Sequence, residues 1–217
     1  ISNEKSSLNL ISHKYFQDKQ LCEIKFRNNI YKFETNLVGK IQIKNILMAM
    51  LAAEKSGLNF KQIINVIHKI KPVSGRIEKI GTIKNNSKVI LDYAHTPAAL
   101  QTCLLNLKEQ FKHKKISIVF GCGGNRDQAK RPMMGKIANL FCDKIYLTDD
   151  NPRNENPKKI RLAIKKKINK SKCYEVPDRS EAIKKALSGL KIGDILLVAG
   201  KGHENVQHYG KIKKLFS

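Results

Sequence analysis

The chain has 217 residues, of which 41% are hydrophobic and 28% are charged, values typical of a globular protein with one or two domains. No apolar run approaches the roughly 18 residues of a membrane-spanning helix, and the sequence does not open with a secretory signal pattern. Five scattered cysteines without a C-x-x-C pair argue against a disulfide framework and a zinc site. They indicate reduced thiols and a cytoplasmic protein.

The formal net charge of +24 has two explanations. One is binding to nucleic acid, which a dense basic surface favours. The other is compositional, because lysine is spread over predicted helices, strands and loops alike and only 6% of residues are aromatic. We favour the second explanation and expect no specific nucleic-acid partner. A basic nucleic-acid-binding protein remains the alternative of a different class.

The first third of the chain predicts a small mixed segment. Residues 21–27 and 30–34 read as two strands of a tight hairpin around Asn28 and Asn29. Two helices are expected next, at about 44–56 and 60–70. A hinge is expected after them, at 71–75. Because a hairpin and two helices bury little core, we expect residues 1–74 to be the tail of a larger domain and the chain to be a fragment.

From residue 89 onward, strands and helices alternate. Strands are predicted at 89–91, 116–120, 145–147, 173–176 and 195–199. Helices are predicted between them, at about 97–112, 131–141, 157–168 and 179–189. This alternation indicates βαβ units, and therefore an α/β fold with a mainly parallel, doubly wound, Rossmann-like sheet.

Polar clusters follow four of the predicted strands, at 92–97, 121–127, 148–157 and 200–204. Because parallel strands end at one edge of the sheet, these loops are expected to form one site. In the third loop, Arg153 could hold a ligand carboxylate as a planar fork and Asp150 could accept from a ligand ammonium. An amino acid carries both groups. The alternative for this loop is an ordinary polar turn, capped by Asn156 before Pro157.

Three motifs with known chemistry are incomplete or absent. The run 121–126 has Arg126 where a dinucleotide fingerprint needs glycine, and the run 203–207 ends in Gln207 where a zinc protease has histidine. No Walker A phosphate loop occurs. The glycines do permit close backbone approach to a ligand. We therefore expect no metal ligands on this chain.

Six motifs, taken together and in order, resemble a known family: Gly75-Arg76-x-Glu78, 92–97, 120–127, 130–132, 150–153 and 200–207. The set is similar to the carboxyl-terminal part of Mur ligases, over about 39–207. Within that family it resembles the branch that adds meso-diaminopimelate to UDP-N-acetylmuramoyl-L-alanyl-D-glutamate in peptidoglycan synthesis. The resemblance implies that 1–74 is an incomplete end of the central ATP-binding domain and that 75–217 is the carboxyl-terminal, amino-acid-binding domain.

The resemblance also implies site residues. Those matching meso-diaminopimelate-binding positions are Arg126, Asp150, Asn151, Pro152, Arg153, Gly200 and Glu204. Arg76 matches an arginine that reaches ATP, and Asp92 matches a position near the ribose. Asn45 falls in a segment near adenine, although the family's Phe-Asn start is Ile41-Gln42 here. His95 lies in the same cleft and is grouped with the ATP positions without a defined role.

The implied reaction is an amide ligation in which ATP activates the D-glutamate carboxylate as an acyl phosphate and the amine of diaminopimelate attacks it. The phosphate loop, most Mg²⁺ ligands and the main catalytic groups belong to upstream segments in the family. We therefore expect a monomeric, cytoplasmic ligase that uses ATP and Mg²⁺, of which this chain alone is inactive. A related ligase using lysine or another amino acid, or a folate or cyanophycin ligase, remains an alternative.

Overall fold

The structure is a computed structural model that describes residues 7–83 and 85–216. The chain divides into two compact units, Ile1–Pro72 and Val73–Ser217. Each unit is described by itself. The hypothesis that the first unit completes a larger ATP-binding domain stays a prediction.

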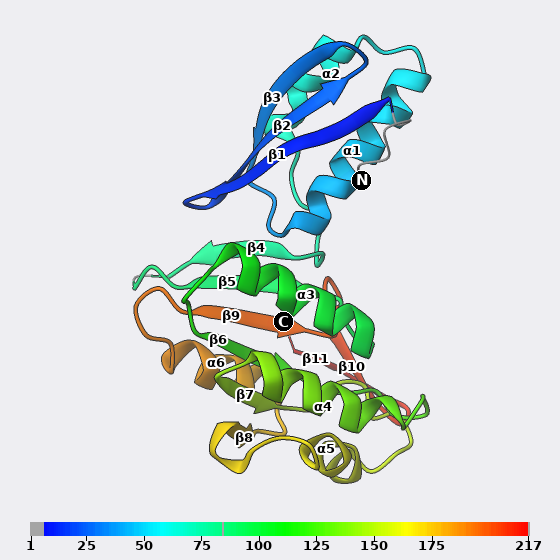
Figure 1. Ribbon diagram of the computed structural model, residues 1–217. Helices are drawn as coiled ribbons and strands as arrows, with labels where there is room; N and C mark the ends of the chain where they lie inside the picture. Colours follow the sequence, from blue (N-terminus) through cyan, green and yellow to red (C-terminus); the bar gives the residue numbers. More distant parts are fainter. Residues whose placement is uncertain (1–6, 84, 217) are drawn as a thin grey trace. The chain divides into compact units, whose positions relative to one another are not determined.

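The first unit has an antiparallel sheet of β1 (Leu8–Phe16), β2 (Lys19–Phe26) and β3 (Asn29–Thr35) (Figure 1). The predicted hairpin is β2–β3, but its turn lies one residue earlier than expected. Phe26 pairs with Asn29, and Arg27 takes the left-handed backbone conformation with φ 52°. Strand β1 was not predicted, because its register shift between Leu10 and Ser12 interrupts the alternation that marks a strand.

Helix α1 (Lys40–Lys55) is followed by α2 (Phe60–Val66) and a short 3₁₀ turn, Ile67–Lys69. The predicted start of α1 near residue 44 is wrong by one turn. Gly39, with φ 88°, is the N-cap, and the buried Ile43 already belongs to the apolar face of the helix. The core of this unit includes Phe26 stacked on Phe60, with ring centroids 3.9 Å apart.

The second unit contains a six-stranded sheet in the order β4-β5-β9-β6-β7-β8. Its strands are β4 (Glu78–Thr82), β5 (Lys88–Asp92), β6 (Ile116–Phe120), β7 (Lys144–Leu147), β8 (Cys173–Glu175) and β9 (Ile195–Ala199). Strand β4, which was not predicted, pairs antiparallel to β5, and the other neighbours pair in parallel. The predicted α/β fold with a mainly parallel sheet is confirmed.

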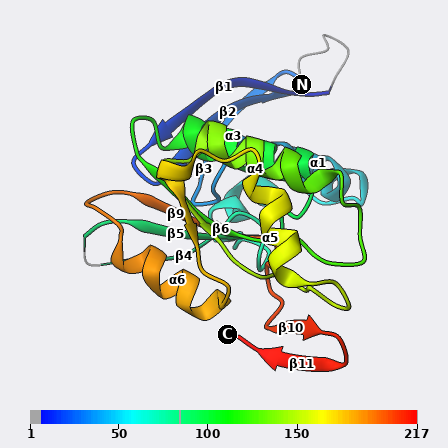
Figure 2. The same cartoon turned by 90° about the horizontal axis from the view of Figure 1, so that it is seen from below.

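Helices cover both faces of this sheet. They are α3 (Pro97–Gln110), α4 (Lys130–Phe141), α5 (Pro157–Lys165) and α6 (Arg179–Ser188), with a 3₁₀ turn at Lys170–Lys172. Figure 2 shows α3 and α4 on one side of the sheet and α6 on the other. Helix α6 buries Ala182 and Ala186 against Val119, Leu196 and Val198 of the central strands. Because β6 and β9 are buried along their whole length, they form the centre of the core.

The order of the strands determines where the loops meet. Strand β9 is the last strand of this sheet in sequence but lies between β5 and β6, with Asp92 beside Ala199 and Val119 beside Val198. The carboxyl ends of β5, β9, β6 and β7 therefore lie next to one another at one edge. This is the switch point at which open α/β sheets bind ligands.

A carboxyl-terminal hairpin, β10 (Val206–Tyr209) and β11 (Ile212–Leu215), was not predicted. An isolated parallel bridge between Arg153 and Tyr209 pairs it with the 150–153 loop. Its four-residue strands, one of them fully exposed, carry too little hydrophobic pattern to be recognised in sequence. Across the described ranges 7–83 and 85–216, no helix is long and apolar enough to cross a membrane.

The link between the two units yields a testable prediction. Val73 is 71% exposed and Ile70 is 38% exposed, and exposed linkers are where proteolysis concentrates. Limited digestion with thermolysin, followed by mass spectrometry, should cut first ahead of Ile70 or Val73 and release two stable fragments. First cuts inside the central strands of the second unit would contradict the division.

Candidate functional site

A pocket of about 490 Å³ lies where the loops after β5, β6, β7 and β9 meet. Its wall includes Arg126, Asp150, Asn151, Arg153, Gly200 and Glu204, which are all predicted amino-acid-binding positions. Pro152, the remaining predicted position, lies in the same loop but not in the wall. The pocket thus brings cations and carboxylates from three loops together, a composition that suits a ligand carrying both signs of charge.

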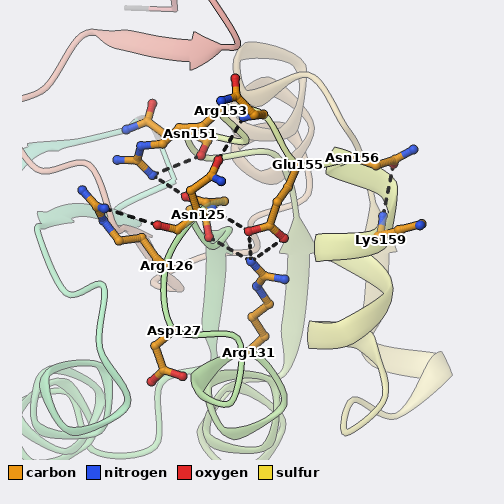
Figure 3. Close-up of polar contacts among 12 residues, drawn as sticks. Asn125, Arg126, Asp127, Arg131, Asn151, Arg153, Glu155, Asn156 and Lys159 are labelled. Carbon is orange, nitrogen blue, oxygen red and sulfur yellow. Dashed lines mark hydrogen bonds and ion pairs between the residues drawn. The ribbon is translucent and has the colours of Figure 1, made fainter.

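Arg153 has a constrained backbone. Its φ of 51° is in the left-handed region, which is unfavourable for a residue with a side chain. Its N–H donates to the carbonyl of His208 (2.9 Å), and its carbonyl accepts from the N–H of Gly210 (2.7 Å). The Nη1 group donates to the carbonyl of Gly124 at 2.8 Å (Figure 3). Within the described part of the chain, the hydrogen bonds of this guanidinium come from Nη1, which leaves Nε and Nη2 for a ligand carboxylate.

The glycines after β6 let this loop approach the 150–153 loop. A Cβ atom on Gly124 would lie 1.9 Å from the carbonyl oxygen of Pro152, and one on Gly123 would lie 2.9 Å from Nη1 of Arg153. The N–H of Gly124 donates to the carbonyl of Asn151 (2.8 Å). The close approach that the sequence predicted toward a ligand is, at these two positions, an approach to the neighbouring loop.

An ion pair between the buried Arg131 of α4 and the partly buried Glu155 lies beside these two loops. Nη2 of Arg131 donates to both carboxylate oxygens of Glu155 at 2.9 Å, and Glu155 also accepts from the N–H of Asn125 (Figure 3). Burial alone would raise the pKa of Glu155, but the hydrogen bonds from Asn125 and Arg131 outweigh it and lower the pKa. The pair fixes the loop that carries Arg126, whose guanidinium is exposed and bonds the carbonyl of Asn125 (3.3 Å).

Lys201 is a buried residue next to the pocket that the sequence did not single out. Its side chain is 2% exposed, and its Nζ donates to Oδ1 of Asn151 (2.8 Å), Oε2 of Glu204 (2.8 Å) and the carbonyl of Val206 (2.6 Å). An ammonium has three N–H donors, and here each has an acceptor. A lysine between two glycines reads as part of a turn, so its burial was not visible in sequence.

The carboxylates of Glu204 and Asp150 line the same pocket. Oε1 of Glu204 accepts from the hydroxyl of Tyr93 at 3.2 Å. Burial alone would raise the pKa of Glu204, but the hydrogen bond and charge of Lys201, with Tyr93, lower it. Oδ2 of Asp150 lies beside Gly200, where a Cβ atom would come within 3.1 Å of it. Glu204 therefore stays ionised at neutral pH and can accept from an ammonium.

Asp149, the first carboxylate of the loop, is a structural group. It accepts from Arg161 and from the hydroxyl of Tyr209 (3.1 Å), and Arg161 also donates to Glu175 (3.0 Å). With both of its oxygens engaged, Asp149 anchors the loop to α5 and β10. It is not part of the pocket wall.

The residues predicted to bind ATP do not all line the pocket, in contrast to most of the predicted amino-acid-binding residues. Asp92 is buried, and its two oxygens accept from the N–H groups of Ile77 and Ala94, each at 2.8 Å. Burial raises its pKa, although these bonds and the charge of Arg76 oppose the rise. Asp92 thus holds the segments that carry Arg76 and His95.

Of these ATP positions, His95 lines the pocket, while the guanidinium of Arg76 lies 4.7 Å from the ring centroid of Tyr93. Asn45 belongs to α1 of the first unit, is exposed, and donates to Oε1 of Gln42 at 3.0 Å.

Neither a metal nor a cysteine nucleophile is indicated in the described residues. Among them, no group of three or more His, Cys, Asp or Glu side chains could hold a metal ion. Cys122 lines the pocket, but burial raises its pKa to about 12, so it remains a thiol at neutral pH. All five cysteines are unpaired.

Residues 75–202 match the family described as Mur ligase, glutamate ligase domain. The chain belongs to the Mur ligase family. Over 192 residues it is 47% identical to the UDP-N-acetylmuramoyl-L-alanyl-D-glutamate–2,6-diaminopimelate ligase of Rickettsia montanensis, covering 88% of this chain and 39% of that protein. It is 40% identical over 203 residues to the ligase of the same name from Rhizobium meliloti, covering 94% and 41%.

Solved structures show the same Mur ligase architecture. A UDP-N-acetylmuramoyl-L-alanyl-D-glutamate–2,6-diaminopimelate ligase matches all of this chain and 44% of its own, with a TM-score of 0.73 and 32% identity. A MurF ligase from Thermotoga maritima in complex with ADP matches with a TM-score of 0.66 and 20% identity over 90% of this chain and 43% of its own, which shows the fold. This Mur ligase chain spans about two-fifths of the length of the curated relatives it matches.

The contact between the two loops gives a second prediction. Gly124→Ala places a methyl group against the carbonyl of Pro152. We therefore expect the free energy of unfolding to decrease by about 1–3 kcal/mol, as at other overpacked sites. Gly81→Ala is the matched control, because a Cβ atom there meets nothing within 4 Å. Urea unfolding of both variants measures the effect. Equal losses at the two positions would contradict a tight contact between the loops.

The lowered carboxylate pKa values of Glu155, Glu175 and Glu204 give a third prediction. Their stabilisation is complete above the ordinary value of 4.5 and is lost as pH falls through the lower folded-state values. The free energy of unfolding should therefore decrease as the pH is lowered below 4.5. Glu155→Gln should make this dependence on pH weaker. Glu109→Gln, on the exposed face of α3, is the control. The free energy of unfolding is measured by urea unfolding at several pH values. If it depends on pH in Glu155→Gln as steeply as in the unsubstituted chain, the role of this ion pair is contradicted.

Proposed function

We propose that this chain is the amino-acid-selecting part of an ATP-dependent ligase that joins meso-diaminopimelate to the D-glutamate of UDP-N-acetylmuramoyl-L-alanyl-D-glutamate in peptidoglycan synthesis. The observation that carries the proposal is one pocket that holds Arg126 and Arg153 together with Asp150 and Glu204. The names of relatives that are 40–47% identical support the same substrate.

The pocket chemistry matches one end of diaminopimelate. Each end of this molecule has a carboxylate and an ammonium, so a selective site must bind the far end while the near amine reacts. Arg153 and Arg126 can hold the carboxylate, and Glu204 and Asp150 can accept from the ammonium.

The remaining substrate positions serve this arrangement. Asn151 is fixed by Lys201, Pro152 stiffens the loop, and Gly200, with φ 103°, leaves space beside Asp150.

The assignment extends to the two units. We propose that residues 1–74 are the carboxyl-terminal portion of the central ATP-binding domain and that 75–217 are the amino-acid-binding domain. Asn45, Arg76, Asp92 and His95 are the proposed ATP positions, with Asp92 acting as a support because backbone N–H groups engage both of its oxygens. ATP would supply the phosphoryl group that activates the D-glutamate carboxylate. The residues of this chain present the attacking amine to it.

In the family, most Mg²⁺ ligands and the main catalytic groups belong to upstream segments, so the proposal assigns them to no residue of this chain. The proposal includes a cytoplasmic, monomeric enzyme whose partners are small molecules, and a chain that does not catalyse by itself.

The alternatives fit the pocket less well. Lysine that reacts through its side-chain amine lacks the distal carboxylate, so its binding would leave Nε and Nη2 of Arg153 without a carboxylate in a partly buried site. For a nucleic-acid-binding protein, the carboxylates of Asp150 and Glu204 would repel phosphate.

The fourth prediction concerns Arg153 in a full-length enzyme. Arg153→Ala should lower kcat/KM for meso-diaminopimelate by roughly ten- to a few hundred-fold, as expected for losing a charge-assisted contact of about 1.5–3 kcal/mol. The use of lysine should change little, because lysine has no group that pairs with this guanidinium. Steady-state kinetics with both amino acids measure the ratio.

Arg153→Lys sharpens the test. It should restore part of the activity, since an ammonium keeps the charge but cannot make a planar two-point contact. If Arg153→Ala reduces the use of both amino acids equally, Arg153 only steadies the loop, and the diaminopimelate assignment is wrong while the family assignment stands.

A further inference from the structure

The carboxyl-terminal hairpin lies beyond residues 75–202, the part that matches the family. Strand β11 is exposed along its whole length, and β10 buries only Gln207. Hydrophobic burial therefore does little to attach the hairpin. Figure 2 shows it as a separate two-stranded element. What attaches it is a set of polar contacts with the 149–153 loop and with the start of α6, where Nζ of Lys214 lies 2.7 Å from Oδ2 of Asp178.

Gln207 makes the central contact of this set. The side chain is 1% exposed, and its Nε2 donates to the carbonyls of Asp149 (2.9 Å) and Asp150 (2.7 Å). Both acceptors belong to buried residues. Without the amide of Gln207, these two carbonyls would lose a donor where water does not readily replace it. The side chain of Gln207 thus supplies the hydrogen-bond donors for two buried carbonyls at the start of the 149–153 loop.

The backbone of the hairpin fixes the end of the same loop. The N–H of Arg153 donates to the carbonyl of His208, and the N–H of Gly210 donates to the carbonyl of Arg153, on either side of the bridge to Tyr209. The left-handed backbone of Arg153 is unfavourable. The N–H of His208 also donates to Oδ1 of Asn151 (3.0 Å). A strained conformation persists only where its surroundings hold it, and here the hairpin supplies those contacts.

The far end of the hairpin is anchored in turn. The ring centroid of Phe216 lies 5.5 Å from the guanidinium carbon of the buried Arg179 and 5.6 Å from Nζ of Lys201. The hydroxyl of Ser180 donates to the carbonyl of Phe216 (3.0 Å). The hairpin is therefore fixed at both ends, with Gln207 between them.

We propose that this hairpin, through Gln207, holds the 149–153 loop in the conformation that directs Arg153 and Asp150 into the pocket. Gln207 is then a positioning residue for selection of the far amino-acid end of the substrate, and the hairpin determines specificity without reacting. The inference about selection rests on the function proposed above. The inference about positioning does not.

The first experiment tests positioning without a ligand. Gln207→Met keeps the length of the side chain and removes both donors, while Gln101→Met, on an exposed position of α3, is the matched control. Amide hydrogen exchange of the 217-residue chain should become about tenfold faster at Arg153 and Gly210 in Gln207→Met. Exchange in β6 and β9 should not change.

The second experiment tests selection in the full-length enzyme. Gln207→Met should raise KM for meso-diaminopimelate about tenfold with a much smaller change in kcat, and should reduce the preference over lysine to the same extent. Tyr209→Phe, which removes only the hydroxyl contact with Asp149, is a milder variant that retains Gln207. It should raise KM for meso-diaminopimelate and reduce the preference over lysine, each by a smaller factor than Gln207→Met does.

Unchanged exchange at Arg153 and Gly210 would overturn the proposal, as would a uniform acceleration that includes β6 and β9, because Gln207 would then serve general stability. If the unsubstituted enzyme shows no preference for diaminopimelate, the proposed function fails. The exchange measurement alone then decides whether the hairpin positions the loop.

Discussion

The backbone of the 149–153 loop is buried at the edge of the sheet, and each of its polar groups needs a partner there. The carbonyls of Asp149 and Asp150 accept from Gln207, and the carbonyl of Asn151 accepts from Gly124. These partners come from two different segments of the chain. The pocket exists because the sheet order brings the β6 loop and the end of β9 to the same place as the end of β7.

The charges around the pocket fall into two groups with different roles. Arg131, Arg161 and Lys201 are buried and form ion pairs with carboxylates of the protein, so they hold the loops around the pocket in place. Arg153 and Arg126 bond mainly to backbone carbonyls and keep guanidinium donors for a ligand. A site that binds a zwitterion requires this separation, because a ligand cannot displace a buried ion pair without leaving a charge unpaired.

The sequence predicted what depends on local pattern. Alternating strands and helices indicated the parallel sheet, and the polar runs after its strands indicated the loops that now line one pocket. The roles of Lys201 and Gln207 could not be predicted, because both depend on partners about 50 residues or more away in sequence. The hairpin that carries Gln207 has no hydrophobic pattern of its own. Asp92 was correctly placed at a strand end, but its engagement by two backbone N–H groups becomes visible only in three dimensions.

The central claim is that the pocket recognises an amino-acid end bearing a carboxylate and an ammonium together. Calorimetric titration of the 217-residue chain with meso-diaminopimelate and with 1,5-diaminopentane, which keeps both ammonium groups and lacks the carboxylates, tests it most directly. The account predicts saturable binding of diaminopimelate and at least about tenfold weaker binding of the diamine, the difference expected from one charge-assisted contact. Equal affinity for the two ligands would contradict it.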